Sequence, residues 1–231
     1  MDTLERDLQE LGRVRAPRGF AGRVLTAAGV GDRYAKLETP IGTFFVVWNR
    51  AGITSVERDR PSRGQEVAEL PPRLQFDLSG LTEFEQAVLR KTLEIPRGEV
   101  RTYAWVAREI GRPRAVRAVG SALAGNPIPI LIPCHRVVRS DGVIGQYGAG
   151  GPSAKRTILA HEGADPDGLT ELARRGIRFV GSRNTHVFCL PACRDARRIE
   201  EANRVPFHDE REAFGAGYRP CTHCRPAAVA S

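Results

Sequence analysis

The sequence predicts a chain in three parts: an α/β front subdomain with a small sheet over residues 1–80, an α-helical subdomain containing a helix-turn-helix over residues 81–164, and a small α+β domain over residues 165–231. Three observations support this division. Two β-rich runs lie in the first part, helical patterns punctuated by Pro and Gly fill the second, and four of the five cysteines fall in the third. With 41 % hydrophobic and 27 % charged residues, the chain has an ordinary globular composition.

The composition also excludes several classes of protein. The apolar runs are only a handful of residues long, as in Phe44–Trp48, whereas a membrane-spanning helix needs about 20 residues. The first residues, MDTLERDLQELGRVR, are charged and lack the apolar centre of a secretory signal. We therefore expect a cytoplasmic protein with no membrane partner, whose reduced cysteines serve chemistry or metal binding rather than disulfides.

A helix followed by a hairpin is predicted for the first part. The helix rests on an apolar spacing carried by Leu4, Leu8, Leu11 and Val14. The hairpin joins the runs Phe44–Trp48 and Ile53–Val56 through a Gly-containing turn, and the polar stretch Pro61–Pro72 is expected to be a connector. Because this part offers no nucleophile, base or cluster of metal ligands, we interpret it as scaffold.

Three helices are predicted in the central part. The first opens with Thr82 and Glu85 in the spacing of a capping box. The second spans Tyr103–Ile110 and the third Arg114–Ala124, each closed by a glycine. Two short helices joined by a tight turn outline a helix-turn-helix, whose second helix enters a DNA groove. A plain pair of packed helices has the same pattern.

The distribution of charge favours DNA over a plain pair of packed helices. The net charge is +8, and residues 81–164 carry 12 basic against 7 acidic residues, so the excess is concentrated in the central part. The third predicted helix is built from small residues that allow close approach to a duplex. Six arginines fall within 21 residues of this part: Arg97, Arg101, Arg108, Arg112, Arg114 and Arg117. The alternative is an arginine-rich but merely solvated surface.

A cysteine next to a histidine is the first candidate for chemistry. Cys134 lies in a proline-rich segment that we expect to be extended and stiff, with prolines at Pro127, Pro129 and Pro133. A cysteine reacts as its thiolate and needs a base or positive charge beside it. His135 is adjacent, but neighbouring side chains of an extended segment point to opposite sides, so it would act through a water or a bend. Glu162 could orient the imidazole, although a lone cysteine is most often a buried apolar residue.

The whole stretch around Cys134 resembles a known family. GNPIPILIPCHRVV, the LAHEG that follows the Gly-rich loop, and the upstream RTYAWVA and RAVRAVGSALAGN are similar to the O6-alkylguanine-DNA alkyltransferases, over about residues 35–164. The resemblance implies a ribonuclease-H-like front sheet. It also implies that Cys134 accepts the alkyl group, that His135 is its general base through a water, that Glu162 holds the imidazole and that Asn126 braces the turn.

The same resemblance implies a substrate and a way of reaching it. The partner would be double-stranded DNA carrying O6-alkylguanine or O4-alkylthymine, the protein a monomer that joins the nucleoid when bound, and each molecule would react once. Tyr103 would contact the target base, Arg117 would fill the gap left by the flipped nucleotide, and Arg114 and Arg136 would bind DNA. The loop QYGAGG has one residue more than the commonest pattern, which affects the shape of the pocket.

The remaining cysteines follow the pattern C-x3-C-x27-C-x2-C, carried by Cys189, Cys193, Cys221 and Cys224. Two close pairs separated by a long loop are typical of a tetrahedral four-thiolate zinc site. His186, His208 and His223 lie nearby, but four thiolates make them unnecessary as ligands. Two disulfides are the alternative pairing, and a purely structural zinc site is the alternative to a reactive one.

The segments FVGSRNTHVFCLPAC and FGAGYRPCTHCRP resemble the zinc-binding methyl-acceptor module of the Ada protein. The resemblance implies that Cys189 takes a methyl group from DNA methylphosphotriesters while bound to one Zn²⁺, and that the other three cysteines are only ligands. Here the module follows the guanine-repair part, with DPDGLT at residues 165–170 as the expected boundary. No segment is long enough for Ada's regulatory domain, so transcriptional activation is not implied.

Together these features predict a single-turnover methylated-DNA–protein-cysteine methyltransferase. The alternative from another class is a non-catalytic sensor of alkylated DNA, or a transcriptional regulator, with a structural zinc module. The presence of Cys134 favours the repair protein.

Overall fold

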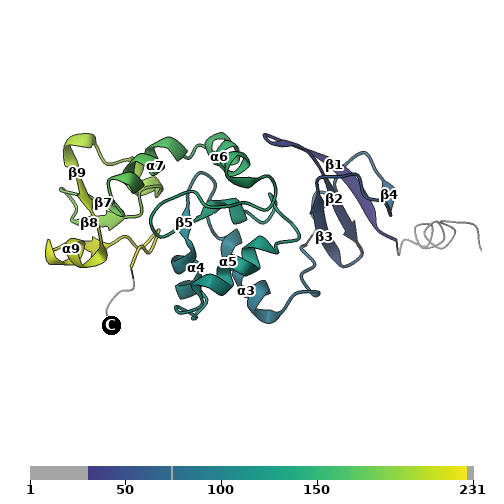
Figure 1. The fold of residues 1–231 in the computed structure, drawn as a ribbon, viewed down its shortest axis with the longest axis horizontal. Coiled ribbons are helices and arrows are strands. Elements are labelled where there is room, and N and C mark those ends of the chain that lie inside the picture. The colour runs from purple at the N-terminus through teal and green to yellow at the C-terminus, as the bar shows by residue number, and fades with distance from the viewer. Residues whose placement is uncertain (1–30, 74, 228–231) are drawn as a thin grey trace, which may run out of the picture. The chain divides into compact units, whose positions relative to one another are not determined.

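The computed structural model describes residues 31–73 and 75–227, which form two compact units (Figure 1). One unit comprises Met1–Leu37 and Thr43–Asp77, and the other Glu38–Gly42 and Leu78–Ser231. The helix expected over Leu4–Val14 lies outside the described residues. Within the described residues, no helix is both long and apolar enough to cross a bilayer.

The first unit is a four-stranded sheet in the order β3-β2-β1-β4. β1 (Arg33–Thr39), β2 (Gly42–Asn49) and β3 (Gly52–Glu57) form its larger part, and β2 and β3 are the predicted hairpin. The expected connector contains a two-residue strand, β4 (Gln65–Glu66), which pairs in parallel with β1. Apolar side chains that alternate along these strands form the core of this unit: Tyr34, Phe44, Val46, Trp48, Ile53 and Val56.

The second unit begins with the helices of the central part. α3 (Glu83–Leu93) has the predicted capping box between Thr82 and Glu85, and it buries Val88, Leu89 and Thr92. β5 (Arg101–Thr102) leads into α4 (Tyr103–Glu109), and α5 (Val116–Ala124) packs on both α3 and α4. The prediction that α5 begins at Arg114 was wrong by two residues, because the Ala115 amide donates to the Arg112 carbonyl and completes a turn first.

The segment that carries Cys134 is not extended as predicted. It is a 3₁₀ turn, η1 (Cys134–Arg136), in which the Arg136 amide donates to the Pro133 carbonyl at 2.8 Å. Proline lacks an N–H and has its φ fixed, so it opens a helical turn as readily as it extends a strand. The turn runs into β6 (Val137–Val138), which pairs in parallel with β5. After the Gly-rich loop, α6 (Gly151–His161) ends with Glu162 as its C-cap.

The expected boundary at residues 165–170 is helical. Asp165 accepts a hydrogen bond from the Gly168 amide and so caps α7 (Pro166–Arg174). The Asp, Pro and Gly that indicate a linker also suit the first turn of a helix, where Asp caps and Pro needs no amide partner. The three-part division by residue number therefore stays a prediction.

The cysteine-rich part forms a second four-stranded sheet in the order β10-β8-β7-β9. Its strands are β7 (Phe179–Ser182), β8 (Val187–Cys189), β9 (Arg204–Phe207) and β10 (Arg219–Pro220). Three short helical segments connect them: α8 (Arg194–Arg197), η2 (Glu201–Asn203) and α9 (Glu210–Gly215).

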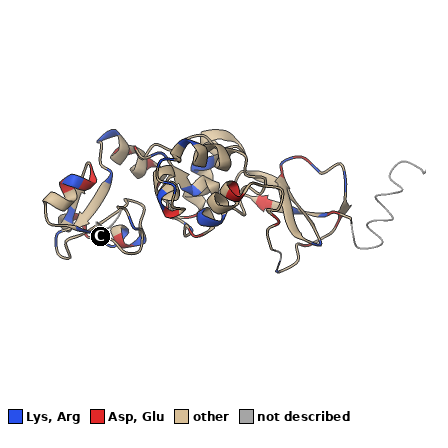
Figure 2. Cartoon of the chain, turned by 90° about the horizontal axis from the view of Figure 1, so that it is seen from below, with Lys and Arg blue, Asp and Glu red and all other residues tan. Residues whose placement is uncertain are grey.

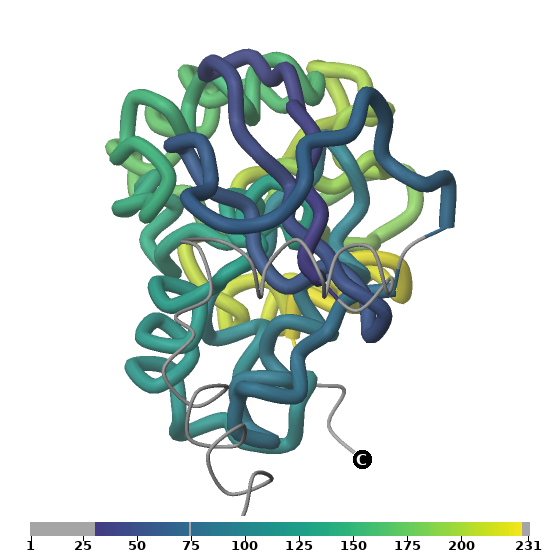
Figure 3. The backbone as a smooth tube through the Cα atoms, turned by 90° about the vertical axis from the view of Figure 1, so that its right-hand side faces the viewer, coloured from purple at the N-terminus to yellow at the C-terminus, as the bar shows by residue number. Residues whose placement is uncertain are grey.

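This part packs against the central helices as well as on its own sheet. Ala192 is buried in the same apolar cluster as Val100, Val138, Ile144 and Leu159. The yellow C-terminal segments run beside the teal segment that carries α4 (Figures 1 and 3), and a hydrogen bond joins them, from Trp105 Nε1 to the Cys224 carbonyl. Residues 78–227 are therefore one packed unit.

Candidate functional site

The sulfur of Cys134 is held at the buried end of the η1 turn. Its side chain is 7 % exposed. Asn126 donates from Nδ2 to Cys134 Sγ at 3.2 Å and to the Ile132 carbonyl at 3.1 Å, while its Oδ1 accepts from the Ile128 amide. Asn126 therefore ties the proline-rich loop to the sulfur. Burial raises the pKa of the Cys134 thiol despite the Asn126 hydrogen bond, so the resting side chain is a thiol.

The imidazole of His135 is buried between a carboxylate and an aromatic ring. Its Nε2 lies 3.0 Å from Glu162 Oε1, and its ring packs edge-on against Tyr147 with centroids 5.9 Å apart. Burial lowers the pKa of His135 although Glu162 opposes this, so the ring is neutral at neutral pH. The other nitrogen, Nδ1, is buried and has no hydrogen-bond partner among the described residues.

Glu162 is fixed by two neighbours. Arg136 donates from Nε and Nη2 to its two carboxylate oxygens at 2.9 and 2.7 Å, and a third donor, Nη1, reaches the Ile95 carbonyl at 2.7 Å. Burial alone would raise the pKa of Glu162, but the hydrogen bonds from His135 and Arg136 lower it to about 2. The carboxylate is therefore charged at neutral pH, and it lies at hydrogen-bonding distance from the imidazole; its role in orienting the ring stays a prediction.

The helix-turn-helix places its predicted residues at different depths. Tyr103 opens α4, and burial raises the pKa of its phenol. Arg114 and Arg117 are exposed, at and near the start of α5, whereas Val119, Ala122 and Leu123 face the core. Figure 2 shows basic and acidic positions interspersed along the helices and loops. Arg136 does not join the exposed arginines, since its guanidinium is engaged by Glu162.

The four remaining cysteines come together. Cys189 ends β8, Cys193 caps α8, and Cys221 and Cys224 flank the turn after β10. Their sulfurs lie within 4.8 Å of one another, all four side chains are buried, and none is in a disulfide. The structure therefore has no disulfide among these four cysteines. Instead, they form a cluster of free thiols whose number and spacing suit a metal ion with tetrahedral coordination.

The three nearby histidines are not part of this four-sulfur set. His186 packs against the ring of Tyr218, and His208 pairs with Glu212. His223 Nε2 lies 3.1 Å from Glu99 Oε1, a residue of the segment before β5. A pocket of about 550 Å³ adjoins the cluster and is lined by Cys189 and Cys221, together with Arg198 and Arg219.

Comparison with known proteins matches two segments of the chain to two family models. Residues 83–164 match the family model described as 6-O-methylguanine DNA methyltransferase, DNA binding domain, and residues 173–227 match the metal binding domain of Ada. A solved Mycobacterium tuberculosis O6-methylguanine methyltransferase is 33 % identical over 61 % of this chain and 99 % of its own, with a TM-score of 0.50. The M. tuberculosis OGT solved in complex with DNA is 31 % identical over 59 % of this chain and 98 % of its own, also with a TM-score of 0.50.

This chain belongs to the O6-methylguanine-DNA methyltransferase family. Among curated relatives, the rat methylated-DNA–protein-cysteine methyltransferase is 46 % identical over 112 residues, which is 48 % of this chain and 52 % of the relative. The Mycobacterium leprae protein of the same name is 47 % identical over 89 residues, 38 % of this chain and 53 % of the relative. The chain thus spans about half the length of the curated relatives it matches.

One buried residue of this methyltransferase fold was not predicted as part of the site. Lys155 is fully buried in α6, and its Nζ donates to the Val137 carbonyl at 2.5 Å, just after the η1 turn. Burial lowers the pKa of Lys155 to about 8, against the attraction of Cys134, which raises it. The signal was present in the sequence, since Lys155 shares a helix face with Ile158 and Leu159.

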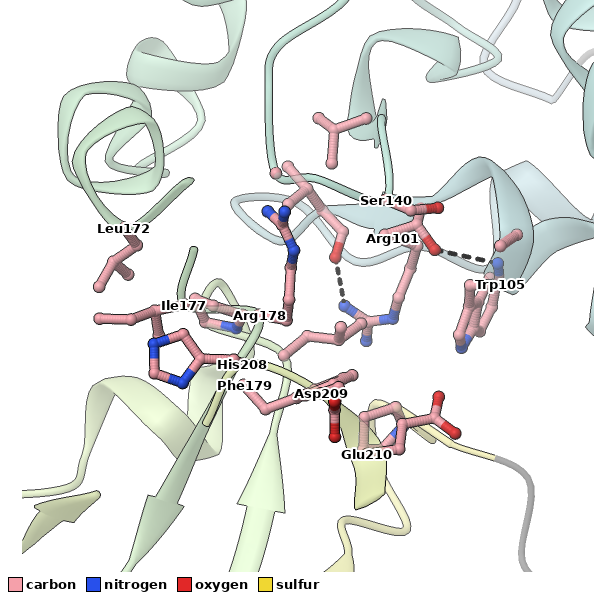
Figure 4. Close-up of a pocket in the computed structure, with 18 of the residues that line it drawn as sticks. Arg101, Trp105, Ser140, Leu172, Ile177, Arg178, Phe179, His208, Asp209 and Glu210 are labelled. Atoms are coloured by element: carbon pink, nitrogen blue, oxygen red, sulfur yellow. Dashed lines mark hydrogen bonds between the residues drawn. The ribbon is translucent and has the colours of Figure 1, made fainter. Parts of the chain in front are cut away.

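A pocket of about 500 Å³ was also not predicted, and it is shown in Figure 4. Its walls combine the apolar Leu172, Ile177 and Phe179 with Arg101 and Arg178. Neither Cys134 nor Cys189 lines it. Its lining includes Trp105 and Arg108 of α4 together with Leu190 and Pro191 of the cysteine-rich part.

Proposed function

We propose that this protein repairs DNA by moving the alkyl group of O6-alkylguanine, and of O4-alkylthymine, onto Cys134 in a single turnover. The observation that carries the proposal is the array of Asn126, Cys134, His135 and Glu162, in which a buried thiol adjoins a neutral, oriented imidazole. An isolated thiol near its usual pKa of about 8.5 would be a poor nucleophile at neutral pH, so a positioned base is needed.

The proton path follows from the hydrogen bonds. Because Glu162 accepts from Nε2–H of His135, the buried Nδ1 is left as an acceptor for one water between it and Cys134 Sγ. As the sulfur attacks the alkyl carbon, the C–O6 bond breaks and a C–S bond forms. The thiol proton passes through the water to His135, guanine leaves as an anion, and the imidazolium then gives up its proton through solvent as guanine is protonated at N1, so no proton is gained or lost overall. The product thioether resists hydrolysis, so the protein is consumed.

Access to the base supports double-stranded DNA as the partner. An O6-alkyl group inside a duplex cannot meet the sulfur in line, so the nucleotide must leave the stack at a cost of a few kcal/mol. We propose that the exposed Arg117 fills the gap, that Arg114 binds the backbone, and that Tyr103 contacts the flipped base. The hydrogen bonds of Arg136 support a role in holding Glu162, and its predicted contact with DNA remains a prediction.

Intact-mass spectrometry tests the guanine reaction directly. Protein mixed with an O6-methylguanine duplex should gain the mass of one methyl group, located to the peptide that contains Cys134. Cys134→Ala should still bind the duplex and gain nothing. A Cys134→Ala protein that still removes the methyl group from guanine would refute the assignment, and binding without any transfer by the wild type would favour the sensor alternative.

We also propose that Cys189, Cys193, Cys221 and Cys224 hold one Zn²⁺ and that Cys189 is a second acceptor, for DNA methylphosphotriesters. Four buried thiols in one cluster fit zinc, which would keep the sulfurs as thiolates without a base. The pocket beside Cys189 carries Arg198 and Arg219, which suit a phosphate, and it is also lined by the acidic Asp195 and Glu200. In the transfer the methyl–oxygen bond breaks, a C–S bond forms, and a phosphodiester anion leaves.

This second reaction is tested on DNA with methylphosphotriesters but normal guanines. The Cys134→Ala protein should gain one methyl group on Cys189 and keep its zinc. A fully zinc-loaded protein that takes no methyl group from this DNA would reduce the cluster to a structural site. We further propose that the front sheet is ribonuclease-H-like. The protein would be a monomer, and it would associate with the nucleoid when bound to DNA.

A further inference from the structure

The first helix of the helix-turn-helix is joined to the turn that carries two of the clustered cysteines. Trp105 Nε1 donates to the Cys224 carbonyl at 2.9 Å. Arg108 donates to the carbonyls of Arg225 and Pro226, and Arg225 returns an ion pair to Glu109 at 2.8 Å. Arg225 adopts a positive φ of 45°, a strained conformation for a non-glycine residue. These contacts hold the turn of Cys221–Arg225 against one face of α4.

A buried carboxylate joins the other half of the cluster to the same corner. Glu99 is 1 % exposed, and its Oε1 accepts from the Arg194 amide at 3.2 Å and lies 3.1 Å from His223. Its Oε2 pairs with Arg101 Nη2 at 2.7 Å. Arg194 follows Cys193 and His223 precedes Cys224, so Glu99 contacts both ends of the cluster. A buried charge with this many partners cannot move without losing them, which is costly.

The corner that receives these contacts also builds the site at Cys134. Arg101 pairs with Val137 and Thr102 with Val138 in the β5–β6 ladder, and Val137 directly follows the η1 turn. The Thr102 hydroxyl caps α4 by accepting from the Trp105 amide at 3.0 Å, and Tyr103 is the next residue. The strand and cap that position Cys134 and Tyr103 are therefore the elements that Glu99 and Trp105 attach to the cluster.

We propose that Glu99 and Trp105 are positioning residues for alkyl transfer to Cys134, through which the metal-loaded cysteine cluster keeps the β5–α4 corner in its reactive geometry. The inference rests on the proposed function of Cys134. A metal ion held by the four sulfurs would fix the turn of Cys221–Arg225 relative to Cys193. The Trp105 and Glu99 hydrogen bonds would transmit that restraint to the corner.

The test uses the full zinc-loaded chain and free O6-benzylguanine, which reacts without DNA binding or base flipping. Trp105→Phe removes the indole N–H but keeps an aromatic ring, and Trp48→Phe makes the same change in the first unit. Trp105→Phe should slow benzylation of Cys134 about threefold to tenfold, as expected for one buried hydrogen bond, and Trp48→Phe should leave the rate unchanged. Glu99→Gln should act in the same direction as Trp105→Phe.

Metal removal supplies the second arm. Chelating the zinc from the wild type under reducing conditions should lower its benzylation rate to that of Trp105→Phe or below, and the Trp105→Phe change should then have little further effect. Amide hydrogen exchange should quicken in the peptide covering residues 99–110 upon chelation and, in loaded protein, upon Trp105→Phe. The peptide covering α3 should stay protected in both cases. Restoring zinc should restore the wild-type rate and protection.

The outcomes separate this inference from the proposed function. The positioning role would be overturned if Trp105→Phe and Trp48→Phe had equal benzylation rates. It would also be overturned if amide hydrogen exchange over residues 99–110 changed neither on zinc removal nor in Trp105→Phe. If the loaded wild type takes neither a benzyl group nor a methyl group from an O6-methylguanine duplex, the proposed function of Cys134 fails, and hydrogen exchange alone then decides whether the cluster supports the corner. If it takes only the methyl group, the same variants are compared by their rate on that duplex.

Discussion

The two proposed cysteine sites would make sulfur reactive by different physical means. At Cys134 one thiol is buried, burial raises its pKa, and the proposed reactivity would depend on the neutral His135 and the charged Glu162 beside it. At the cluster that contains Cys189, four sulfurs lie within 4.8 Å, and a shared cation would replace the base. The first site should therefore depend on pH and on one chain of hydrogen bonds, and the second on metal.

The largest expected effect separates the two sites by stability. Cys221→Ser should abolish zinc binding and unfold the cysteine-rich part, because the metal-binding free energy of such a site is folding free energy. Cys134→Ser should melt within a few degrees of the wild type, since Ser is close in size to Cys and Asn126 can still donate to it. Thermal melting with a zinc-release assay measures both. Equal melting curves for the two variants would contradict the contrast.

The substitution Glu162→Gln tests the proposed role of His135 as the general base. A general base contributes about a hundredfold or more, and loss of its orientation should cost about tenfold to a hundredfold in benzylation rate. Burial lowers the pKa of His135 while Glu162 raises it, so replacing Glu162 should lower that pKa further. The wild-type rate should fall as His135 is protonated at acidic pH, and in the variant this acid limb should move to lower pH. A limb that moves to higher pH would contradict the proposed pair.

The residues that we propose to react could be picked out from the sequence, whereas most of the contacts that support them could not. Cys134, His135, Asn126 and Glu162 lie within 37 residues of one another, in motifs whose chemistry can be read locally. The capping box of α3 is equally local, and it was confirmed. The shape of the η1 turn was wrong, because prolines allow both an extended segment and a helical turn, and tertiary packing decides between them.

The link between the two sites could not be predicted from the sequence. His223 and Glu99 are 124 residues apart, and Trp105 and Cys224 are 119 apart. Nothing local marks such a contact: Glu99 looks like one acidic residue among arginines until its burial is known. The cysteine spacing predicted the cluster but not the surface on which it packs. Contacts between residues that lie far apart in the sequence can therefore be identified only from the structure.

The substitution Arg117→Ala separates extrusion of the base from the duplex from the transfer reaction at Cys134. The side chain of Arg117 is exposed near the start of α5. Within the described residues, it forms no hydrogen bond or ion pair with Cys134 or His135. Repair of O6-methylguanine in a duplex should slow about tenfold, in line with the few kcal/mol that base flipping costs, whereas reaction with free O6-benzylguanine should be unchanged. Rapid-quench assays on both substrates measure this. Equal slowing of the two reactions would point to a structural arginine.

The smallest expected effect comes from methylation of the second site. Four thiolates and one Zn²⁺ carry a net charge of −2, and a methyl group on Cys189 changes it to −1. A unit charge about 10 Å from a phosphate is worth about 0.4 kcal/mol in water before screening, so affinity for undamaged duplex should rise only about twofold at low salt. Because one more phosphate contact becomes favourable, the dependence of affinity on salt should steepen by less than one unit. Fluorescence anisotropy of the Cys134→Ala protein, before and after reaction with a methylphosphotriester duplex, measures both quantities. A gain of a hundredfold would mean that methylation rearranges the surface around Cys189 rather than only removing one negative charge.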